Sequence, residues 1–186
     1  DNSLNGFSLH EIILDVNGRP VDFRFLQVNK AFEMLTGLKA ETTIGRRATD
    51  VMPGIEQESF IPVYGQVAKT GIPVRFEQYS APIRKFFDIA AFSPKPGQFA
   101  TIFTDITERK KAEDENRRLA TAIQQAAEAV VITSADGIIE YINPAFTRIS
   151  GYAPEEAVGQ HIRFFKSDKH PPEFFSAMWK TLRNGH

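Results

Sequence analysis

The chain has 186 residues, 42% of them hydrophobic, which is enough to build one good core or two small ones. Its 22 Lys and Arg residues nearly balance 23 Asp and Glu residues, so we expect no basic face and no nucleic-acid partner. The absence of cysteine excludes disulfides, Cys-zinc sites and thiol chemistry, and favours a reducing compartment such as the cytoplasm. No apolar run approaches the roughly 18 residues that a bilayer span requires, and the first ten residues lack a signal-peptide pattern, so we expect no membrane contact.

The first predicted elements are two strands and a short helix. Residues 10–16 and 21–28 have strand composition and flank the turn sequence NGRP. Residues 29–37 predict a helix with Asn29 as its N-cap and Gly37 as its C-terminal stop. Short helical pieces and loops are expected after it.

A second helix and three strands complete this pattern. Residues 56–71 predict a helix that packs on the sheet, because apolar side chains recur at helical spacing at Phe60, Tyr64 and Val67. Three strand-like runs separated by proline-containing turns follow, at residues 72–80, 84–93 and 97–105. Helices grouped between strands in this order predict an α+β domain with an antiparallel sheet.

A long charged helix is expected immediately after the last strand. Asp105 stands at this junction, where an Asp caps free amide groups of the helix that begins there. We assign residues 108–128 to a connector helix. Apolar or small residues and one Asn alternate at spacings of four and three and predict a coiled-coil dimer seam: Ala112, Asn116, Leu119, Ile123, Ala126 and Val130. The alternative is a single amphipathic helix packed on its own domain.

The chain contains two copies of one module. Residues 28–46 and 142–160 align at a constant offset of 114, with identical pairs at Asn29/Asn143, Ala31/Ala145, Phe32/Phe146, Gly37/Gly151, Glu41/Glu155 and Gly45/Gly159. The same offset relates Phe60 to Phe174 and Gly71 to Gly185. The given sequence stops before any counterpart of the last three strands, so we expect the second copy to be incomplete and its large apolar residues to need a covering partner: Phe174, Phe175, Met178 and Trp179.

These motifs resemble the PAS sensory domains. The resemblance rests on VNKAFEMLTG, INPAFTRISGYAPEEAVGQ and the exit sequence DITERK, and it covers nearly the whole chain. It implies a five-stranded antiparallel sheet with helices on one face and a pocket between them. The domains expected are a first PAS domain at 1–107, the connector at 108–128 and an incomplete second PAS domain at 129–186.

The resemblance also implies a signal relay at the exit sequence. Asp105 and Thr107 would fasten the last strand to the outgoing helix, and Arg109, one turn on, could reach the Asp105 carboxylate. The alternative is a stabilising cap with a surface ion pair and no further role.

The first domain offers a candidate ligand pocket. Its expected apolar wall consists of Ile12, Leu14, Phe23, Phe25, Phe32, Met34, Leu35, Met52, Phe60, Tyr64, Phe76, Phe87, Ile89 and Ile102. Arg47, Arg75 and Tyr79 are the polar candidates if the ligand is a carboxylate. The alternative is a filled core without a ligand, because Phe packs densely.

No cofactor is expected in the first domain. Haem-binding PAS relatives need a His on the long helix, where this chain has Tyr64 in the first copy and Met178 and Trp179 in the second. Residues 159–167 resemble the flavin-binding run of the blue-light relatives, but Ile162 replaces the reactive Cys, so flavin remains only an alternative for an intact second domain. The four histidines, at 10, 161, 170 and 186, lack metal-ligand spacing and are expected to be solvated or capping.

The expected function is sensory input to a signal-transduction protein such as a histidine kinase or cyclic-dinucleotide regulator. A small ligand or a change in a homodimer would act through the connector helix. The alternative is a ligand-free dimerisation scaffold. No catalytic motif is present, so an output enzyme would lie outside this chain.

Overall fold

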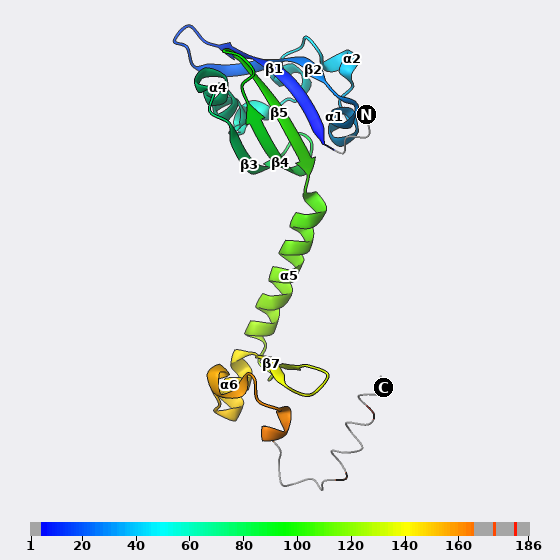
Figure 1. The fold of residues 1–186 in the computed structure, drawn as a ribbon, viewed down its shortest axis with the longest axis vertical. Helices are drawn as coiled ribbons and strands as arrows, with labels where there is room; N and C mark the ends of the chain where they lie inside the picture. Colours follow the sequence, from blue (N-terminus) through cyan, green and yellow to red (C-terminus); the bar gives the residue numbers. More distant parts are fainter. Residues whose placement is uncertain (1–4, 166–172, 174–180, 182–186) are drawn as a thin grey trace. The chain divides into compact units, whose positions relative to one another are not determined.

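The computed structural model describes residues 5–165 together with Glu173 and Thr181. The chain divides into two compact units, residues 1–113 and 114–186. The first unit contains a five-stranded sheet and the second a two-stranded one (Figure 1). Some residues singled out in the sequence lie outside the described part of the chain: His170, Phe174, Phe175, Met178, Trp179 and His186.

The sheet of the first unit is antiparallel throughout, as predicted. Its strands are β1 (Gly6–Leu14), β2 (Pro20–Val28), β3 (Val74–Ser80), β4 (Lys85–Phe92) and β5 (Gln98–Asp105). Their order across the sheet is β2-β1-β5-β4-β3, so the first and last strands of the unit are neighbours. This pairing places the N-terminal strand beside the strand that leads into the connector.

Strand β1 begins earlier than the sequence predicted. It starts at Gly6 rather than His10, because Gly6 to Glu11 pair residue by residue with Phe103 to Gln98 of β5. The composition of this segment, with Asn, Gly and Ser, resembles a turn, and the sheet partner overrides it. The longer strand places Ser8 and His10 on the same buried face as Ile12.

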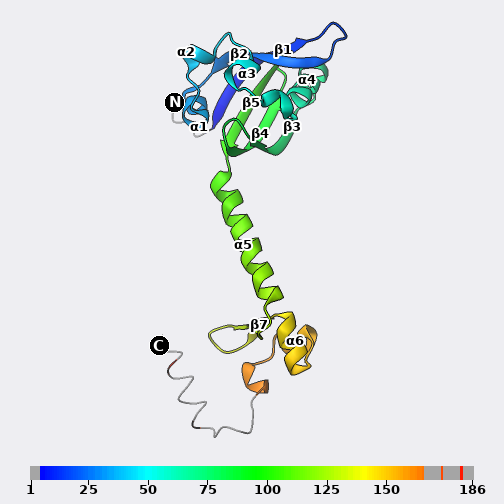
Figure 2. The same cartoon turned by 180° about the vertical axis from the view of Figure 1, so that it is seen from behind.

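The helices of the first unit cover one face of this sheet (Figure 2). They are α1 (Lys30–Thr36), α2 (Ala40–Thr43), α3 (Ala48–Val51), the 3-10 helix η1 (Ile55–Gln57) and α4 (Phe60–Thr70). The core lies between these helices and the sheet, with aromatic rings from both sides in contact. The α+β architecture expected from the sequence is therefore confirmed.

Asn29 fixes the start of α1 to strand β1. Its Oδ1 accepts hydrogen bonds from the amides of Phe32 at 2.8 Å and Phe7 at 3.0 Å, and its Nδ2 donates to the carbonyl of Asn5 at 3.0 Å. The helix ends at Gly37, whose left-handed backbone (φ 78°) lets its amide bond back to Glu33. Both caps were predicted from the sequence, and both are confirmed.

Helix α4 packs closely on the start of β2. Pro62 is its third residue, where the missing amide hydrogen removes no bond within the helix. Gly65 is buried one turn later and faces Pro20. A Cβ at position 65 would lie 2.1 Å from Cγ of Pro20, so only glycine lets the helix approach this near.

The second unit repeats the same local design. It contains β6 (Val131–Thr133), β7 (Ile139–Ile142), α6 (Pro144–Ser150), α7 (Pro154–Ala157) and the 3-10 helix η2 (Ile162–Phe165). Asn143 is the counterpart of Asn29, and its Oδ1 accepts from the amides of Phe146 at 3.0 Å and Val130 at 2.9 Å. A small core forms around Ile139, Ile142, Phe146 and Ala157.

The connector helix is shorter than predicted. Helix α5 spans Thr107–Gln125 and contains no buried residue. Nδ2 of Asn143 donates to the carbonyls of Ile123 at 3.0 Å and Glu128 at 2.9 Å. If the helix continued, the Ile123 carbonyl would instead accept a hydrogen bond from the backbone amide four residues further on. Ala126 and Val130 therefore lie beyond the helix, and the predicted seam is reduced to its other four members: Ala112, Asn116, Leu119 and Ile123.

We expect Gly65→Ala to destabilise the first unit by up to about 2 kcal/mol. Alanine raises helix propensity by about 1 kcal/mol, but a core that must accommodate an extra methyl group loses about 1–3 kcal/mol. Here the obstacle is a proline ring at the start of a strand, which cannot rotate away. Gln66→Ala, on the exposed side of the same helix, is the matched control. Equal thermal unfolding of the two variants would contradict this packing argument.

Candidate functional site

A cavity lies in the first unit between the sheet and the helices. Its volume is about 70 Å³. The described residues that line it are Ser8, His10, Phe23, Phe25, Phe32, Thr36, Met52, Ile55, Phe60, Tyr64, Ser80, Ile83, Phe87, Ile89, Thr101 and Phe103. Most of these side chains are apolar, so the few polar ones decide what the cavity could recognise.

Three polar side chains form a short chain of hydrogen bonds on the cavity wall. Ser8 on β1 stands directly opposite Thr101 on β5, and their hydroxyl oxygens are 2.7 Å apart. Nε2 of His10, two residues further along β1, lies 2.7 Å from the Ser8 Oγ. All three side chains are buried because alternate residues of a strand face the same side of the sheet.

His10 is a buried, neutral histidine. Only 3% of it is exposed, and aromatic rings surround it, with Phe99 stacked at 4.6 Å and Phe23 and Phe25 edge-on at 4.8 Å. Burial lowers its pKa from the ordinary 6.5 to about 3. Its Nδ1 has no hydrogen-bond partner within the described part of the chain. The sequence-based expectation of a solvated or capping residue at this position was wrong.

The predicted pocket residues divide into three groups. Eight line the cavity: Phe23, Phe25, Phe32, Met52, Phe60, Tyr64, Phe87 and Ile89. Three pack in the surrounding core: Ile12, Leu35 and Phe76. The rest lie at the surface: Leu14, Met34, Arg47, Arg75, Tyr79 and Ile102.

Strand and helix periodicity explains the surface group. On β3 the buried Ser80 and the partly buried Phe76 share one face, so Arg75 and Tyr79 face the opposite side. Arg75 instead forms a two-pronged ion pair with Asp88 of β4, with contacts of 3.0 and 2.6 Å. Met34 lies on the exposed side of α1. The cavity thus lacks the positive groups that a carboxylate ligand was expected to meet.

The strand-to-helix junction forms a second candidate site. Asp105 ends β5, and its Oδ1 accepts a hydrogen bond from the amide of Thr107 at 2.9 Å. The Thr107 hydroxyl accepts from the amide of Phe86 at 3.0 Å, and Lys85 Nζ lies 3.0 Å from the other Asp105 oxygen. Partial burial raises the pKa of the Asp105 carboxyl, but the Thr107 hydrogen bonds and the Lys85 ammonium outweigh it and hold the pKa below its ordinary value.

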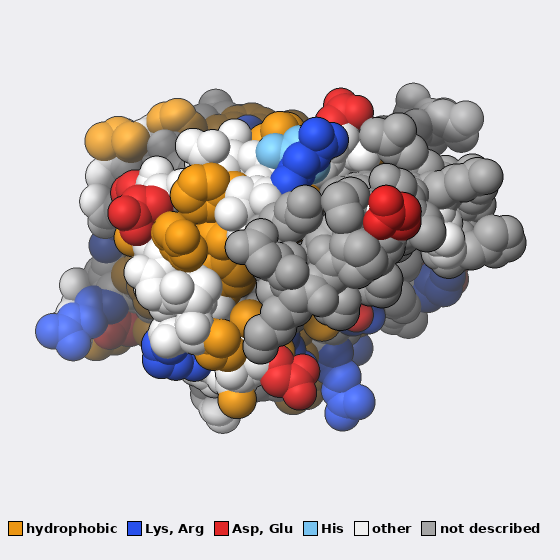
Figure 3. All heavy atoms as spheres, turned by 90° about the horizontal axis from the view of Figure 1, so that it is seen from below, with side chains coloured by type: hydrophobic (Ala, Val, Ile, Leu, Met, Phe, Trp, Pro, Cys, Tyr) orange, Lys and Arg blue, Asp and Glu red, His pale blue; other side chains and the backbone are white. Residues whose placement is uncertain are grey.

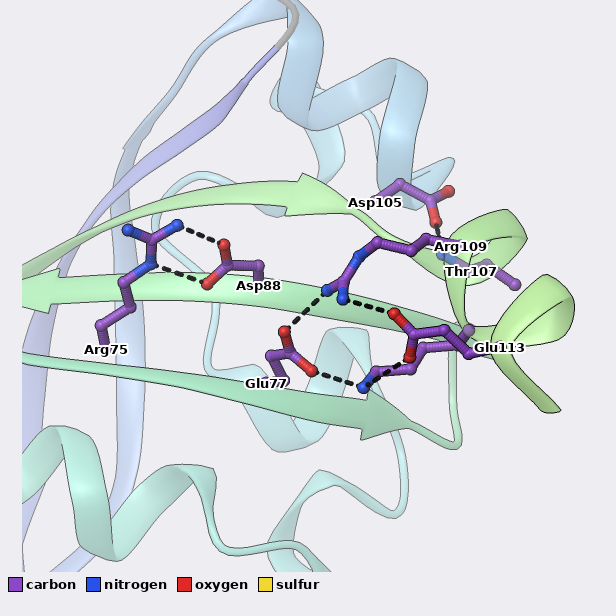
Figure 4. Close-up of polar contacts among 8 residues, drawn as sticks. Arg75, Glu77, Asp88, Asp105, Thr107, Arg109 and Glu113 are labelled. Atoms are coloured by element: carbon purple, nitrogen blue, oxygen red, sulfur yellow. Dashed lines mark hydrogen bonds and ion pairs between the residues drawn. The ribbon is translucent and has the colours of Figure 1, made fainter. Parts of the chain in front are cut away.

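Arg109 does not reach Asp105, which corrects the expected pairing. Lys85 is the cation beside Asp105, and the Arg109 guanidinium instead extends over the outer face of the sheet to Glu77 of β3, at 2.6 Å (Figure 4). Lys110 binds the second Glu77 oxygen, also at 2.6 Å. Glu113 accepts from both cations and completes the cluster. Hydrogen bonds from Lys110 and Arg109 lower the pKa of the Glu77 carboxyl, so it stays charged at neutral pH.

On the face in Figure 3, positive and negative side chains are interspersed, with hydrophobic side chains exposed between them. Within residues 5–165 and the two other described positions, no cluster of three acidic or histidine side chains could hold a metal ion. None of the described helices is both long and apolar enough to cross a membrane.

His10 predicts a distinct loss of stability in acid. The unfolded chain takes up a proton at His10 near pH 6.5 and the folded chain only near pH 3, so between these values unfolding is favoured as the pH falls. Because of His10, the free energy of unfolding should fall by up to about 1.4 kcal/mol for each pH unit of acidification in that window.

We therefore expect His10→Gln to unfold with a weaker pH dependence than the unaltered chain between pH 6.5 and the acid limit. Urea denaturation is measured at several pH values, and hydrogen exchange of the β1 and β5 peptides is the probe because these peptides report the unfolding of the first unit alone. The slope of the unfolding free energy against pH is compared rather than the absolute stability, because the substitution itself alters packing. Parallel pH profiles would show that His10 is already protonated, or accessible, in the folded chain.

Comparisons with known proteins agree with the internal repeat. A PAS fold family matches residues 21–111, and a second PAS fold family matches residues 117–186. A nitrogen fixation regulatory protein of Klebsiella pneumoniae is 39% identical over 62 residues, which are 33% of this chain and 12% of that protein. The bacterioopsin transcriptional activator of Halobacterium salinarum is 28% identical over 146 residues, 77% of this chain and 19% of that protein. The chain therefore spans less than a fifth of the length of these relatives.

Solved structures with similar folds include a domain of an HTR-like protein from Haloarcula marismortui. It is 19% identical with a TM-score of 0.41, covering 56% of this chain and 100% of that one. The PAS domain of the histidine kinase ThkA is 26% identical with a TM-score of 0.35, covering 53% of this chain and 99% of that one. From the two family matches and the repeated motifs, the chain belongs to the PAS family and carries two PAS domains in tandem.

Proposed function

We propose that this chain is the sensory input of a longer signal-transduction protein, in which the state of the first PAS cavity is relayed through β5 to helix α5. Membership of the PAS family supports a sensory role. Two of its relatives are by name a nitrogen fixation regulator and a transcriptional activator, both of them regulatory proteins. The output domain and its activity would lie outside this chain.

The observation that carries this proposal is the double role of strand β5. Thr101 and Phe103 line the cavity, and the same strand ends at Asp105, two residues before α5 begins. No loop intervenes that could absorb a movement. A change in the position of the cavity wall therefore reaches the first turn of the helix through continuous hydrogen-bonded backbone.

Two further strands hold the same helical turn. The amide of Phe86 on β4 bonds to Thr107, and Glu77 on β3 bonds to Arg109 and Lys110. The Glu77 contacts lie on the sheet face opposite the cavity, as the alternation along β3 requires. The helix start is thus fastened to three strands, and a shift between strands would change its environment.

Hydrogen exchange on designed variants tests this relay without knowledge of the ligand. Thr101→Val retains the shape of the side chain but removes its hydrogen bond to Ser8 inside the cavity. We expect this change to alter amide exchange of residues 107–113. Adding Glu77→Gln, which weakens the ion pairs to the helix, should reduce that response.

A control separates the relay from general destabilisation. Ile102→Val alters the exposed face of the same strand without changing its charge. It is not expected to change exchange in residues 107–113 or the response to Thr101→Val. If Thr101→Val leaves the helix start unchanged while it alters exchange around the cavity, the relay does not exist.

A second candidate function, a dimerisation scaffold, is favoured by α5. Every residue of this helix is at least partly exposed, and Leu119 is 56% exposed. Ala112, Asn116 and Ile123 share its face at coiled-coil spacing, and a buried Asn pair would favour two parallel helices in one register. We propose that two copies of the chain pair along this face. Such a homodimer is compatible with the sensory role and would transmit its signal.

Sedimentation over a range of concentrations tests the pairing. Leu119→Glu should shift the chain toward the monomer, because it places charges against each other at the centre of the seam. Thr121→Glu adds the same charge on the opposite side of the helix, where exposure tolerates it. A monomeric unaltered chain, or equal effects of the two substitutions, would contradict dimerisation through this face.

A further inference from the structure

The His10 end of the cavity has an unsatisfied polar atom that the internal packing does not explain. His10 is 3% exposed and lines the cavity, its Nε2 is engaged with Ser8, and its Nδ1 has no hydrogen-bond partner among the described residues. Buried polar atoms are nearly always hydrogen-bonded, so an unpaired nitrogen on a side chain that lines a cavity indicates a missing partner. From this we infer that the cavity is a binding site for a small uncharged hydroxyl compound whose hydroxyl group bonds to Nδ1 of His10.

The lining of the cavity restricts the charge of the ligand. Among the described lining residues none is Lys, Arg, Asp or Glu. His10 itself is neutral, since burial among Phe23, Phe25 and Phe99 disfavours its protonated form. A charged ligand would lose its hydration without gaining a counter-ion. The site therefore favours an uncharged molecule with an apolar body against the phenylalanine rings.

The two tautomers of His10 select the hydroxyl group. If Nε2 carries the proton, it donates to Ser8, and Nδ1 is an acceptor that needs an O–H donor. If Nδ1 carries the proton, Nε2 accepts from the Ser8 hydroxyl, and Nδ1 needs an acceptor oxygen. A hydroxyl group serves in either case, whereas a carbonyl serves in only one. Thr101 completes the chain by bonding to Ser8, so the proton arrangement of all three side chains adjusts to the ligand.

The volume limits the ligand to a few non-hydrogen atoms. About 70 Å³ is far below the roughly 300–1,000 Å³ typical of sites for drug-sized molecules. Ser80 also lines the cavity with an unpaired Oγ, but it lies on β3, three strands from β1. Three inter-strand spacings are about 14 Å, so a molecule this small cannot contact both residues. The Ser80 hydroxyl therefore lies beyond the reach of a ligand of this size bound at His10.

The inference rests on the proposed sensory function and names the ligand class of its cavity. The test is a titration of the full chain, labelled with ¹⁵N-histidine, with the straight-chain alcohols from methanol to 1-pentanol. We expect saturable binding of one member of the series, with a chemical-shift change at Nδ1 of His10 that reports the new hydrogen bond. Acetone, acetate and methylammonium serve as acceptor-only, anionic and cationic probes, and each should bind more weakly.

Substitutions assign the binding to His10. His10→Phe should weaken the affinity for the preferred alcohol about tenfold or more, because it removes the hydrogen-bonding nitrogen. Thr104→Val, on the exposed face of the same strand as Thr101, should leave the affinity unchanged. Thr101→Val, which keeps His10 but disrupts the hydrogen-bond chain, should weaken binding to an intermediate degree. Hydrogen exchange of the β4 and β5 peptides verifies that each variant is folded. If His10→Phe does not fold, the inference is tested with Thr101→Val instead.

Several results would overturn the inference. A non-saturating response that is identical in His10→Phe would mean that water alone satisfies Nδ1. Equal losses in Thr104→Val and His10→Phe, or tighter binding of acetate or methylammonium, would exclude the proposed recognition. The relay can fail separately: saturable alcohol binding without altered exchange in residues 107–113 contradicts the relay and leaves the site intact. An intact relay without saturable alcohol binding overturns only the ligand class.

Discussion

The structure depends on strand β5, which is at once a cavity wall and the anchor of helix α5. Alternation along the strand turns Phe99, Thr101 and Phe103 toward the core and leaves Ile102 exposed. Its position between β1 and β4 supplies hydrogen-bonded neighbours on both sides. Asp105 caps the helix that follows, so no loop separates the strand from the helix. A sensory domain requires such a direct connection, since a flexible linker would absorb any movement of the sheet.

The connector helix is fastened by side chains at each end. At its start, Asp105 and Thr107 join it to β5 and β4. At its end, Asn143 binds the carbonyl of Ile123 while it caps α6. Asn143 and Asn29 are equivalent in the repeat, and both join a helix N-terminus to the strand region that precedes it. The repeated asparagine thus has a structural role in each domain, and in the second domain it also terminates the connector.

Local patterns in the sequence predicted the elements and the family, but the polar features of the sites needed tertiary structure. The caps of α1, the antiparallel sheet and the aromatic core follow from turn chemistry and periodicity. His10 was misjudged because the predicted β1 began there, although Ser8 and Ile12 continue the alternation that buries it. Arg109 was paired with its near neighbour Asp105, whereas Glu77, 32 residues away, binds it across the sheet. Such partners depend on strand order, which no local pattern reveals.

We expect β5 and the first turn of α5 to open as one cooperative unit. Native-state hydrogen exchange at increasing denaturant concentration measures this directly. The amides of Thr107 and Lys110 should exchange with the same opening free energy and denaturant dependence as those of β5. If the helix start instead opens independently, at a much lower free energy than β5, strand and helix are not mechanically joined and the proposed relay is wrong.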